Sequence, residues 1–572
     1  APSHGPDDFN LCLNHGIKAI ETVDGDGKYT KNVHLFEGNH IFKANPIVIE
    51  KLKEQKKLLS SGELVHSYPH SWRSKAPLVH RATPQWFISM ESHKLREKAL
   101  KALDETTFYP SKGKERLKSM IETRPDWCVS RQRVWGVPLP IFVNKKTKEI
   151  LVDDVVNENI ANIYEKEGSD CWFSDDPQRF LGSKYKADDY EKLSDIVEVW
   201  FDSGSTHSFV LEKREDLKWP ASMYLEGSDQ HRGWFHSSLL ESCGTRGKAP
   251  FESILSHGFV VDGKGLKMSK SLGNVIAPDD ILKKYGADIL RIWVASSNYA
   301  EDLRIDHSIL DQHADSYRKI RNTFRYLLGN LNDNFEEIEL EKINLSELPE
   351  LEQFMLHKIY SLNENFKNYF NNYDFHNLYK ELLNFCTVDL SAFYFDIRKD
   401  SLYCDAKDSK KRKSTIILLN IILNSLLKWF APILSFTTEE IYRLIMPDDK
   451  SIHLTKFLNF PKSFKNENLN QKWLELIKIR NICNISIEEK RASKEIGSSL
   501  EASLKINLDK KLIDISQDVD FSELCITSNA EVSYLENSET KVQTTKAEGS
   551  KCQVCWKITK DACSRKTCPK HS

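Results

Sequence analysis

The sequence predicts an α/β core followed by an all-helical bundle and a short metal-binding tail. Between residues 121 and 309, apolar runs alternate with helical patterns, which favours a parallel sheet flanked by helices. From 310 to 465 the apolar residues recur at helical spacing with few glycines, as in a helical bundle. Four of the twelve cysteines fall in the last 21 residues. Their clustering predicts a metal site in the tail.

Length and composition indicate a soluble protein of several domains. The 572 residues suggest three to five domains. Because the net charge is only −2, any binding of nucleic acid must depend on local basic patches. The remaining cysteines are scattered singly, as at Cys128 and Cys386, which is typical of reduced intracellular thiols. The apolar run 414–436 carries a polar stripe and is interrupted by Pro432, so we expect a buried bundle helix rather than a membrane span. We therefore expect a cytoplasmic protein.

The N-terminal part combines short β-like runs with turns such as VDGDGKYT and one helical pattern at 45–59. In the core, the segments 197–204, 223–230 and 254–261 are predicted to be buried strands that end in polar loops. A parallel sheet places its chemistry at the carboxyl ends of such strands. We expect the domain boundaries to fall as follows: 1–120, 121–309, 310–465, 466–550 and 551–572.

The stretch VVDGKGLKMSKSLGN, residues 260–274, predicts an anion-binding loop. Its Asp-Gly-Lys-Gly sequence is typical of a hairpin turn, and a helical pattern follows at 279–294. Lys267 and Lys270, with the neighbouring serines and backbone N–H groups, are suited to bind a polyphosphate. A solvated surface loop is the alternative. The chain has no Walker A pattern, so a triphosphate site would be of another kind.

The string Lys-Met-Ser-Lys-Ser at 267–271 resembles the KMSKS signature of class I aminoacyl-tRNA synthetases. Further strings resemble the isoleucyl members of bacterial type, in the right order; the valyl enzymes are the nearer alternative. These strings are SYPHSWRSKAPLVHRATPQWFISM (67–90), RPDWCVSRQRVWGVPLPIF (124–142), VWFDSGSTH (199–207), YLEGSDQHRGWFHSSL (224–239) and HGFVVDGKGLKMSKSLGN (257–274). The resemblance implies the second half of a Rossmann-like catalytic core, a remnant of a β-rich editing insertion, and an anticodon-binding bundle. It also implies activation of isoleucine by ATP with Mg²⁺, through isoleucyl-AMP, and transfer to tRNA(Ile).

The resemblance assigns roles to individual residues. Lys270, assisted by Lys267, stabilises the charge of the leaving pyrophosphate. The carboxylate of Glu226 contacts the adenylate and suits the α-ammonium group of the substrate. The resemblance also implies that Asp229 and Gln230 contact the amino acid or the ribose, and that Trp200 and Trp234 line the apolar pocket for the side chain. It implies that His257 and Gly258 contact the adenine of ATP. Plain core packing is the alternative for the two tryptophans. His231 is either a phosphate or ribose contact or a structural histidine.

The first residues resemble part of the editing insertion, which hydrolyses mischarged Val-tRNA because an apolar pocket rejects a smaller side chain poorly. Asp8 matches the aspartate that binds the ammonium group of the misplaced amino acid. Alternatively, Asp7 and Asp8 begin a helix or turn. The second class I signature, HxGH, does not occur. We therefore expect the C-terminal part of a longer protein, inactive alone. The rival is a non-catalytic tRNA-binding module.

The tail predicts one structural zinc ion. A CxxC pair stands 12 residues before a Cys-x-x-His pair, which is the spacing of a tetrahedral site. The expected ligands are Cys552, Cys555, Cys568 and His571, with Cys563 as a substitute for either of the last two; unliganded thiols are the alternative. With six Lys or Arg against one Asp, the tail is suited to lie on RNA. The basic run 407–413 is either a solvated loop or a tRNA phosphate contact. We expect a monomer that binds no membrane.

Overall fold

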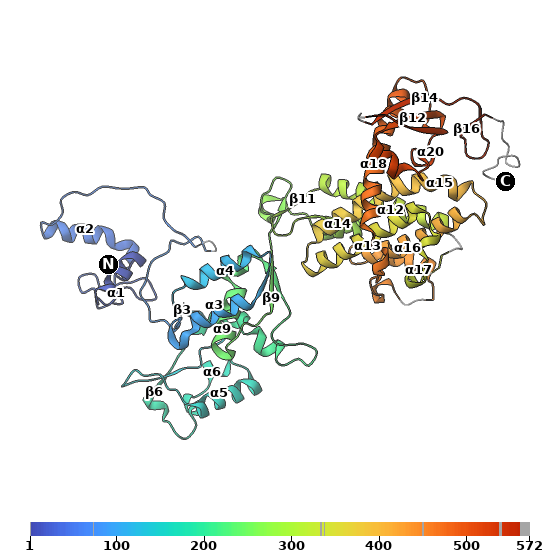
Figure 1. The fold of residues 1–572 in the computed structure, drawn as a ribbon. Coiled ribbons are helices and arrows are strands. Elements are labelled where there is room, and N and C mark those ends of the chain that lie inside the picture. The colour runs from blue at the N-terminus through green and yellow to red at the C-terminus, as the bar shows by residue number, and fades with distance from the viewer. Residues whose placement is uncertain are drawn as a thin grey trace. The chain divides into compact units, whose positions relative to one another are not determined.

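The computed structural model describes residues 2–71, 74–331, 335–336, 338–448, 451–536 and 540–560. The chain divides into two compact units (Figure 1). Unit 1 comprises residues 1–107, 114–224 and 229–253, and unit 2 comprises 108–113, 225–228 and 254–572. Each unit is described by itself.

The N-terminal part of unit 1 has little regular structure. The helix expected at 45–59 is α2, Ala44–Glu54, and a second helix, α1, spans Pro6–Asn14. The VDGDGKYT turn is present: Val23 pairs with Tyr29, and the Asp24 carboxylate accepts two backbone N–H groups across the turn. The predicted turn chemistry is therefore confirmed.

The middle of unit 1 consists of short strand pairs and two packed groups of helices. Around a fully buried Trp172, a small satellite core forms from Phe142, Ile160 and Phe180. The bounds are β1 Phe87–Ile88, α3 Leu95–Glu105, α4 Lys112–Glu122, β3 Trp127–Cys128, β4 Ser130–Arg131, β5 Phe142–Asn144, α5 Asp154–Glu167, α6 Cys171–Ser174, α7 Pro177–Leu181, β6 Tyr190–Lys192 and β7 Ile196–Val197. The pairs β1–β3, β4–β7 and β5–β6 are all antiparallel.

The prediction of a strand over 197–204 is wrong for most of its length. Only Ile196–Val197 is a strand, and the chain turns at once into helix α8, Val199–Gly204. Helix α8 packs against α9, Trp234–Arg246. Gly204 permits this approach, because a Cβ there would lie 2.1 Å from Oε1 of Glu241. A short apolar run fits a buried helix as well as a strand, and here tertiary packing decides.

The strand expected at 223–230 is present only over 224–227 and is followed by a 3₁₀ helix, and the strand expected at 254–261 is divided into two strands of different sheets. β8 (Tyr224–Gly227) and β9 (Ser253–His257) lie with β2 (Thr107–Tyr109) in one sheet, in the order β2-β9-β8. β10 (Val260–Asp262) pairs in parallel with β11 (Leu303–Ile305). The helical pattern at 279–294 forms two helices, α10 Pro278–Tyr285 and α11 Ala287–Ser296. Gly286, with φ +85°, separates them.

The helical bundle is confirmed and contains the largest hydrophobic core of unit 2. Its helices are α12 His307–Leu331, α13 Glu350–Asn371, α14 Phe375–Asn384, the π-helix η10 Phe385–Tyr394, α15 Phe395–Tyr403, α16 Lys410–Phe430, α17 Ser435–Ile445 and α18 Glu467–Ala492. Within the described residues, α16 alone is long and apolar enough to cross a membrane, and 72% of its apolar window is buried inside the protein. This burial agrees with the expected bundle helix.

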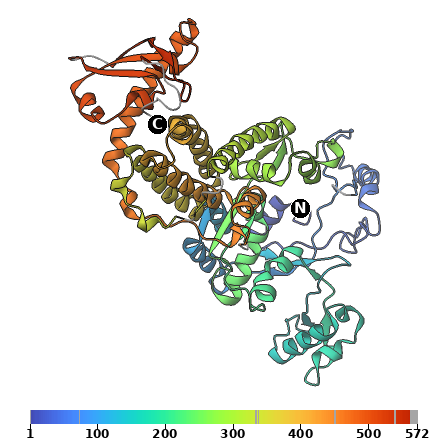
Figure 2. The same cartoon turned by 90° about the vertical axis from the view of Figure 1, so that its right-hand side faces the viewer.

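The mixed segment after the bundle is a small α/β module. Strand β12, Ala502–Leu508, pairs in parallel with β13, Asn529–Tyr534, and antiparallel with β14, Lys541–Lys546. Alternate residues of β12 are buried, which is the pattern of a sheet with one covered face. Helices α19 (Lys510–Ser516) and α20 (Phe521–Leu524) and the hairpin of β15 (Ser550–Lys551) and β16 (Ile558–Thr559) complete it. Helix α18 runs from the bundle to this module (Figure 2).

Candidate functional site

The loop that carries the two predicted lysines folds as a hairpin in unit 2. Val261 pairs antiparallel with Lys267, and Gly265 takes φ +82° in the turn. Lys267 and Lys270 are both exposed, and Nζ of Lys267 lies 5.8 Å from the centre of the Phe259 ring. Lys270 begins a single 3₁₀ turn, Lys270–Leu272. The loop therefore presents two ammonium groups to solvent, as an anion-binding loop requires.

Two side chains that the sequence analysis did not select hold this loop closed. The Asp262 carboxylate accepts the backbone N–H groups of Lys264 and Leu266, at 3.0 and 2.8 Å, and the Nδ2 group of Asn274, at 2.9 Å. Oδ1 of Asn274 in turn accepts the N–H of Ser269 at 2.9 Å. The hydrogen bond from Asn274, followed by that from Leu266, keeps the pKa of Asp262 below its ordinary value. Asp262 and Asn274 thus join the two ends of the lysine loop.

The predicted adenine contacts lie where β9 ends, also in unit 2. Gly258 is sterically required, because a Cβ there would lie 2.2 Å from the backbone oxygen of Glu301. Its N–H donates to the carbonyl of Tyr299 at 2.9 Å. Nδ1 of His257 lies 2.7 Å from the carbonyl oxygen of Gly258. Glu226 lies on β8 of the same sheet, with an exposed carboxylate that is free to face a ligand.

The other predicted substrate residues lie in unit 1, at the start of α9. The Trp234 ring stacks on Tyr224 with centroids 4.0 Å apart, and its Nε1 donates to the carbonyl of Ser203 at 2.9 Å. Gln230 accepts the N–H of Trp234 at 3.0 Å and donates to Asp229 at 3.1 Å. These contacts fix Trp234 and Gln230 in one orientation.

Trp200 lies close to this group. A Cβ at Gly233 would lie 2.4 Å from Oε1 of Gln230 and 2.9 Å from the Trp200 ring, so the glycine lets both side chains approach. Trp200 is 39% exposed and lines a groove of about 800 Å³ in unit 1. This exposure argues against plain core packing for Trp200, whereas Trp234 is half-buried. His231 is buried, with its ring edge-on to Phe235, which favours the structural alternative.

Three carboxylates cluster at the wall of the groove, and no local sequence pattern predicted their meeting: Glu198 and Asp202 line the groove, and the buried Glu241 lies near them. Glu198 accepts hydrogen bonds from Nε1 of Trp127 and from the Arg131 guanidinium. Glu241 is 9% exposed, and its Oε1 accepts no hydrogen bond from the described residues. Burial, with Asp202 and Glu198 nearby, raises the pKa of Glu241 to about 9. Glu241 is therefore protonated at neutral pH.

Asp8 lies in the first turn of α1, where its carboxylate also suits the positive end of the helix dipole. Asp7 and Asp8 therefore do stand at the start of a helix, as the alternative interpretation expected. The basic run 407–413 is only partly a loop: Ser409 caps α16, whose first turn holds four basic residues. Within that turn, Lys411 forms an ion pair with Glu523.

The first two predicted zinc ligands form a knuckle at the end of unit 2. Cys552 and Cys555 are buried, and the backbone N–H of Val554 lies 3.4 Å from Sγ of Cys552. Burial raises the pKa of the Cys555 thiol to about 11. Paired thiols in a tight hairpin fit half of a tetrahedral zinc site. Within the part of the chain that the structure describes, no third ligand joins them; the other predicted ligands, Cys563, Cys568 and His571, lie outside the described residues.

Comparison with protein families identifies two matched regions. Residues 17–306 match the family model of class I tRNA synthetases for isoleucine, leucine, methionine and valine. Residues 352–506 match the model of the anticodon-binding domain of tRNA ligases. The first match covers just over half of the chain and includes the lysine loop, Glu226, both tryptophans and His257.

Individual relatives agree with these families. The chain is 81% identical over 565 residues to an isoleucine–tRNA ligase of Pelagibacter ubique, an alignment that covers 99% of this chain and 62% of the relative. It is 46% identical to one of Gluconobacter oxydans, covering 98% of the chain and 59% of that protein. The chain thus spans about three fifths of their length. A Mycobacterium tuberculosis methionyl-tRNA synthetase in complex with methionyl-adenylate aligns with TM-score 0.47 and 16% identity, over 77% of this chain and 79% of that one.

Proposed function

The chain belongs to the class I tRNA synthetases, and from that premise we propose that it serves an isoleucine–tRNA ligase. The reaction joins isoleucine to AMP at the expense of ATP and then transfers the isoleucyl group to tRNA(Ile). The specificity for isoleucine rests on the 81% identity to the Pelagibacter relative. Because the chain spans about three fifths of that relative, the activity is proposed for the protein that carries these residues.

One observation carries the proposal: the geometry of the lysine loop suits a phosphate group. Its two ammonium groups are exposed, and the Asp262–Asn274 contact fixes both of its ends. When the isoleucine carboxylate attacks the α-phosphate, negative charge accumulates on the departing pyrophosphate. The ammonium group of Lys270, assisted by that of Lys267, lowers the activation barrier by stabilising this negative charge. Mg²⁺ on the ATP phosphates would share this task.

The remaining site residues receive roles that suit their chemistry. Glu226 supplies a counter-charge for the substrate ammonium group. Trp200 and Trp234 provide apolar surface for the branched side chain, with Asp229 and Gln230 as polar contacts. His257 and Gly258 hold the adenine against the backbone. At Gly258 the close approach of the Glu301 backbone excludes any larger residue, so the position next to the proposed adenine site carries no side chain.

Isoleucine-dependent ATP–pyrophosphate exchange by the protein that carries these residues tests the catalytic assignment. Lys270→Ala should reduce exchange by about 10²–10³-fold, the effect of removing one preorganised charge-stabilising group. Lys264→Ala is the matched control, because Lys264 lies in the same hairpin outside the signature. Equal rates for Lys270→Ala and the control would refute the role of Lys270. Exchange that prefers valine to isoleucine would instead assign the valyl reaction.

The second half of the chain is proposed to bind the tRNA. The match of residues 352–506 to an anticodon-binding domain supports this role. Zn²⁺ held by Cys552 and Cys555, with Cys568 and His571 or with Cys563 in place of one of them, would give the tail its fold. Filter binding of tRNA(Ile) to the chain tests the assignment, and binding no tighter than that of an unrelated tRNA would contradict it.

We also propose that Asp8 contributes to hydrolysis of mischarged Val-tRNA, by binding the valine ammonium group. The sequence around Asp8 and its exposed position support this role. Asp8→Ala should slow deacylation of Val-tRNA(Ile) by the intact enzyme, whereas Asp7→Ala should not. Equal deacylation rates for both variants would refute the editing role of Asp8 and show that it only stabilises the start of α1.

A further inference from the structure

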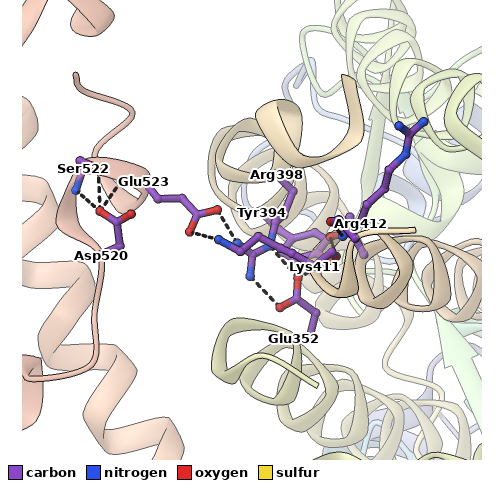
Figure 3. A network of polar contacts seen from close by, with 10 residues as sticks. Glu352, Tyr394, Arg398, Lys411, Arg412, Asp520, Ser522 and Glu523 are labelled. Carbon is purple, nitrogen blue, oxygen red and sulfur yellow. Dashed lines mark hydrogen bonds and ion pairs between the residues drawn. The ribbon is translucent and has the colours of Figure 1, made fainter. Parts of the chain in front are cut away.

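A buried ion-pair network joins the helical bundle to the C-terminal module of unit 2 (Figure 3). Arg398 on α15 donates from Nε and Nη2 to the two carboxylate oxygens of Glu352 on α13, both at 2.6 Å. The two side chains are 4% and 0% exposed. The buried Tyr394 hydroxyl donates to the same carboxylate at 3.0 Å. Arg398 is therefore fixed in the bundle by a two-pronged, desolvated contact.

The third nitrogen of Arg398 reaches out of the bundle. Its Nη1 donates to Glu523 at 2.8 Å, and Glu523 belongs to α20, more than a hundred residues further along the chain. The other oxygen of Glu523 accepts from Lys411, at the start of α16, also at 2.8 Å. Burial favours the neutral form of Glu523, but Arg398 and Lys411 outweigh it and lower the pKa of the carboxyl. One carboxylate of the C-terminal module is thus held by two helices of the bundle.

The residue that follows α15 also contacts the cysteine knuckle. The thiol of Cys404, which follows the last residue of α15, lies 3.7 Å from the carbonyl oxygen of Val554, between the two knuckle cysteines. Cys404 packs against Cys552 and Cys555. Arg398 and Cys404 are close in sequence, so α15 and the residue after it together contact both α20 and the knuckle. Within the module, the N–H of Ile558 donates to Oγ of Ser528, four residues after α20, at 2.6 Å, so a shift of α20 on the bundle should disturb the knuckle hairpin as well.

We infer that Arg398 is a positioning residue that sets the place of the C-terminal module, residues 498–560, on the bundle. A guanidinium has a planar fork of fixed geometry, so the pair with Glu352 dictates where Nη1 points and hence where Glu523 must lie. Apolar contacts, such as those of Phe521 and Leu524, are not directional in this way. The inference rests on the proposed function in one respect: the positioned module is taken to contribute to tRNA binding.

Amide hydrogen exchange of the whole chain tests the positioning without reference to RNA. Glu523→Gln keeps the shape of the side chain but removes its charge. We expect about tenfold faster exchange in peptides from 520–527 and 552–558, with the core of α16 unchanged. Glu531→Gln is the matched control, since Glu531 is exposed on β13 of the same module. Unchanged exchange in Glu523→Gln would overturn the inference, because apolar packing would then suffice. If that variant does not fold, Lys411→Met should produce the same pattern more weakly.

Binding of tRNA(Ile) to the same variants tests the consequence. Glu523→Gln should weaken binding about tenfold, while Glu531→Gln binds as the wild type does. Faster exchange with unchanged affinity would refute the link to RNA. If the wild-type chain binds no tRNA, the proposed tRNA role of this half fails, yet the exchange measurement still decides whether Arg398 positions the module.

Discussion

Glu241 should make unit 1 less stable as the pH rises, and Glu241→Gln should remove that dependence. The side chain is 9% exposed and is packed against Gly204. In the folded state its pKa is about 9, raised by burial and by the neighbouring Asp202 and Glu198. In the unfolded chain a glutamate has a pKa of about 4.3.

The direction of the pH effect depends on how many protons the folded and unfolded states bind. Between about pH 4.3 and pH 9 the folded state keeps a proton that the unfolded state has lost, so rising pH favours unfolding. The free energy of unfolding should then fall by up to about 1.4 kcal/mol per pH unit in this window. From pH 4.3 to pH 7 the loss reaches about 4 kcal/mol as an upper bound. Below pH 4.3 both states are protonated and the effect vanishes.

Urea unfolding at pH 5, 6, 7 and 8, followed by tryptophan fluorescence, measures this dependence. Glutamine has nearly the same shape and no proton to lose, so the wild type should lose stability relative to Glu241→Gln at each step up in pH. Glu165→Gln, at an exposed site on α5, is the control and should follow the wild type. A constant difference between wild type and Glu241→Gln from pH 5 to pH 8 would refute the reasoning.

Three further outcomes are expected. Glu352→Gln should destabilise unit 2 by about 3–5 kcal/mol in urea unfolding, because it leaves the buried Arg398 charge without its full counter-charge. The double variant Glu352→Leu, Arg398→Met should recover most of this loss. An equal loss of stability in the double variant would contradict the reasoning. Asn274→Ala should slow ATP–pyrophosphate exchange by about tenfold without lowering the melting temperature, since it frees one end of the lysine loop; an unchanged rate would exclude a positioning role. Cys552→Ser should abolish bound zinc in elemental analysis, while Cys404→Ser retains it, and zinc retained by Cys552→Ser would exclude the knuckle as the site.

The parts of the fold that depend on local sequence were predictable. The bundle follows from apolar residues at helical spacing, and the hairpin at 260–267 follows from its glycines. The strand predicted at 197–204 was wrong because a short apolar run does not distinguish a strand from a buried helix; packing of α8 on α9 selected the helix. The helix expected at 279–294 is interrupted by Gly286, a break that a glycine marks but does not require.

By itself, the sequence determined the lysine loop, the cysteine pair, the helical bundle and, through its resemblance, the family. Each of these depends on residues close together in the chain, whose conformational preferences act locally. Only the tertiary structure decided which distant groups meet. Gly258 must be glycine because Glu301 approaches it, and Arg398 meets Glu523 across more than a hundred residues. Such contacts depend on how the elements pack, and no short stretch of sequence encodes that packing.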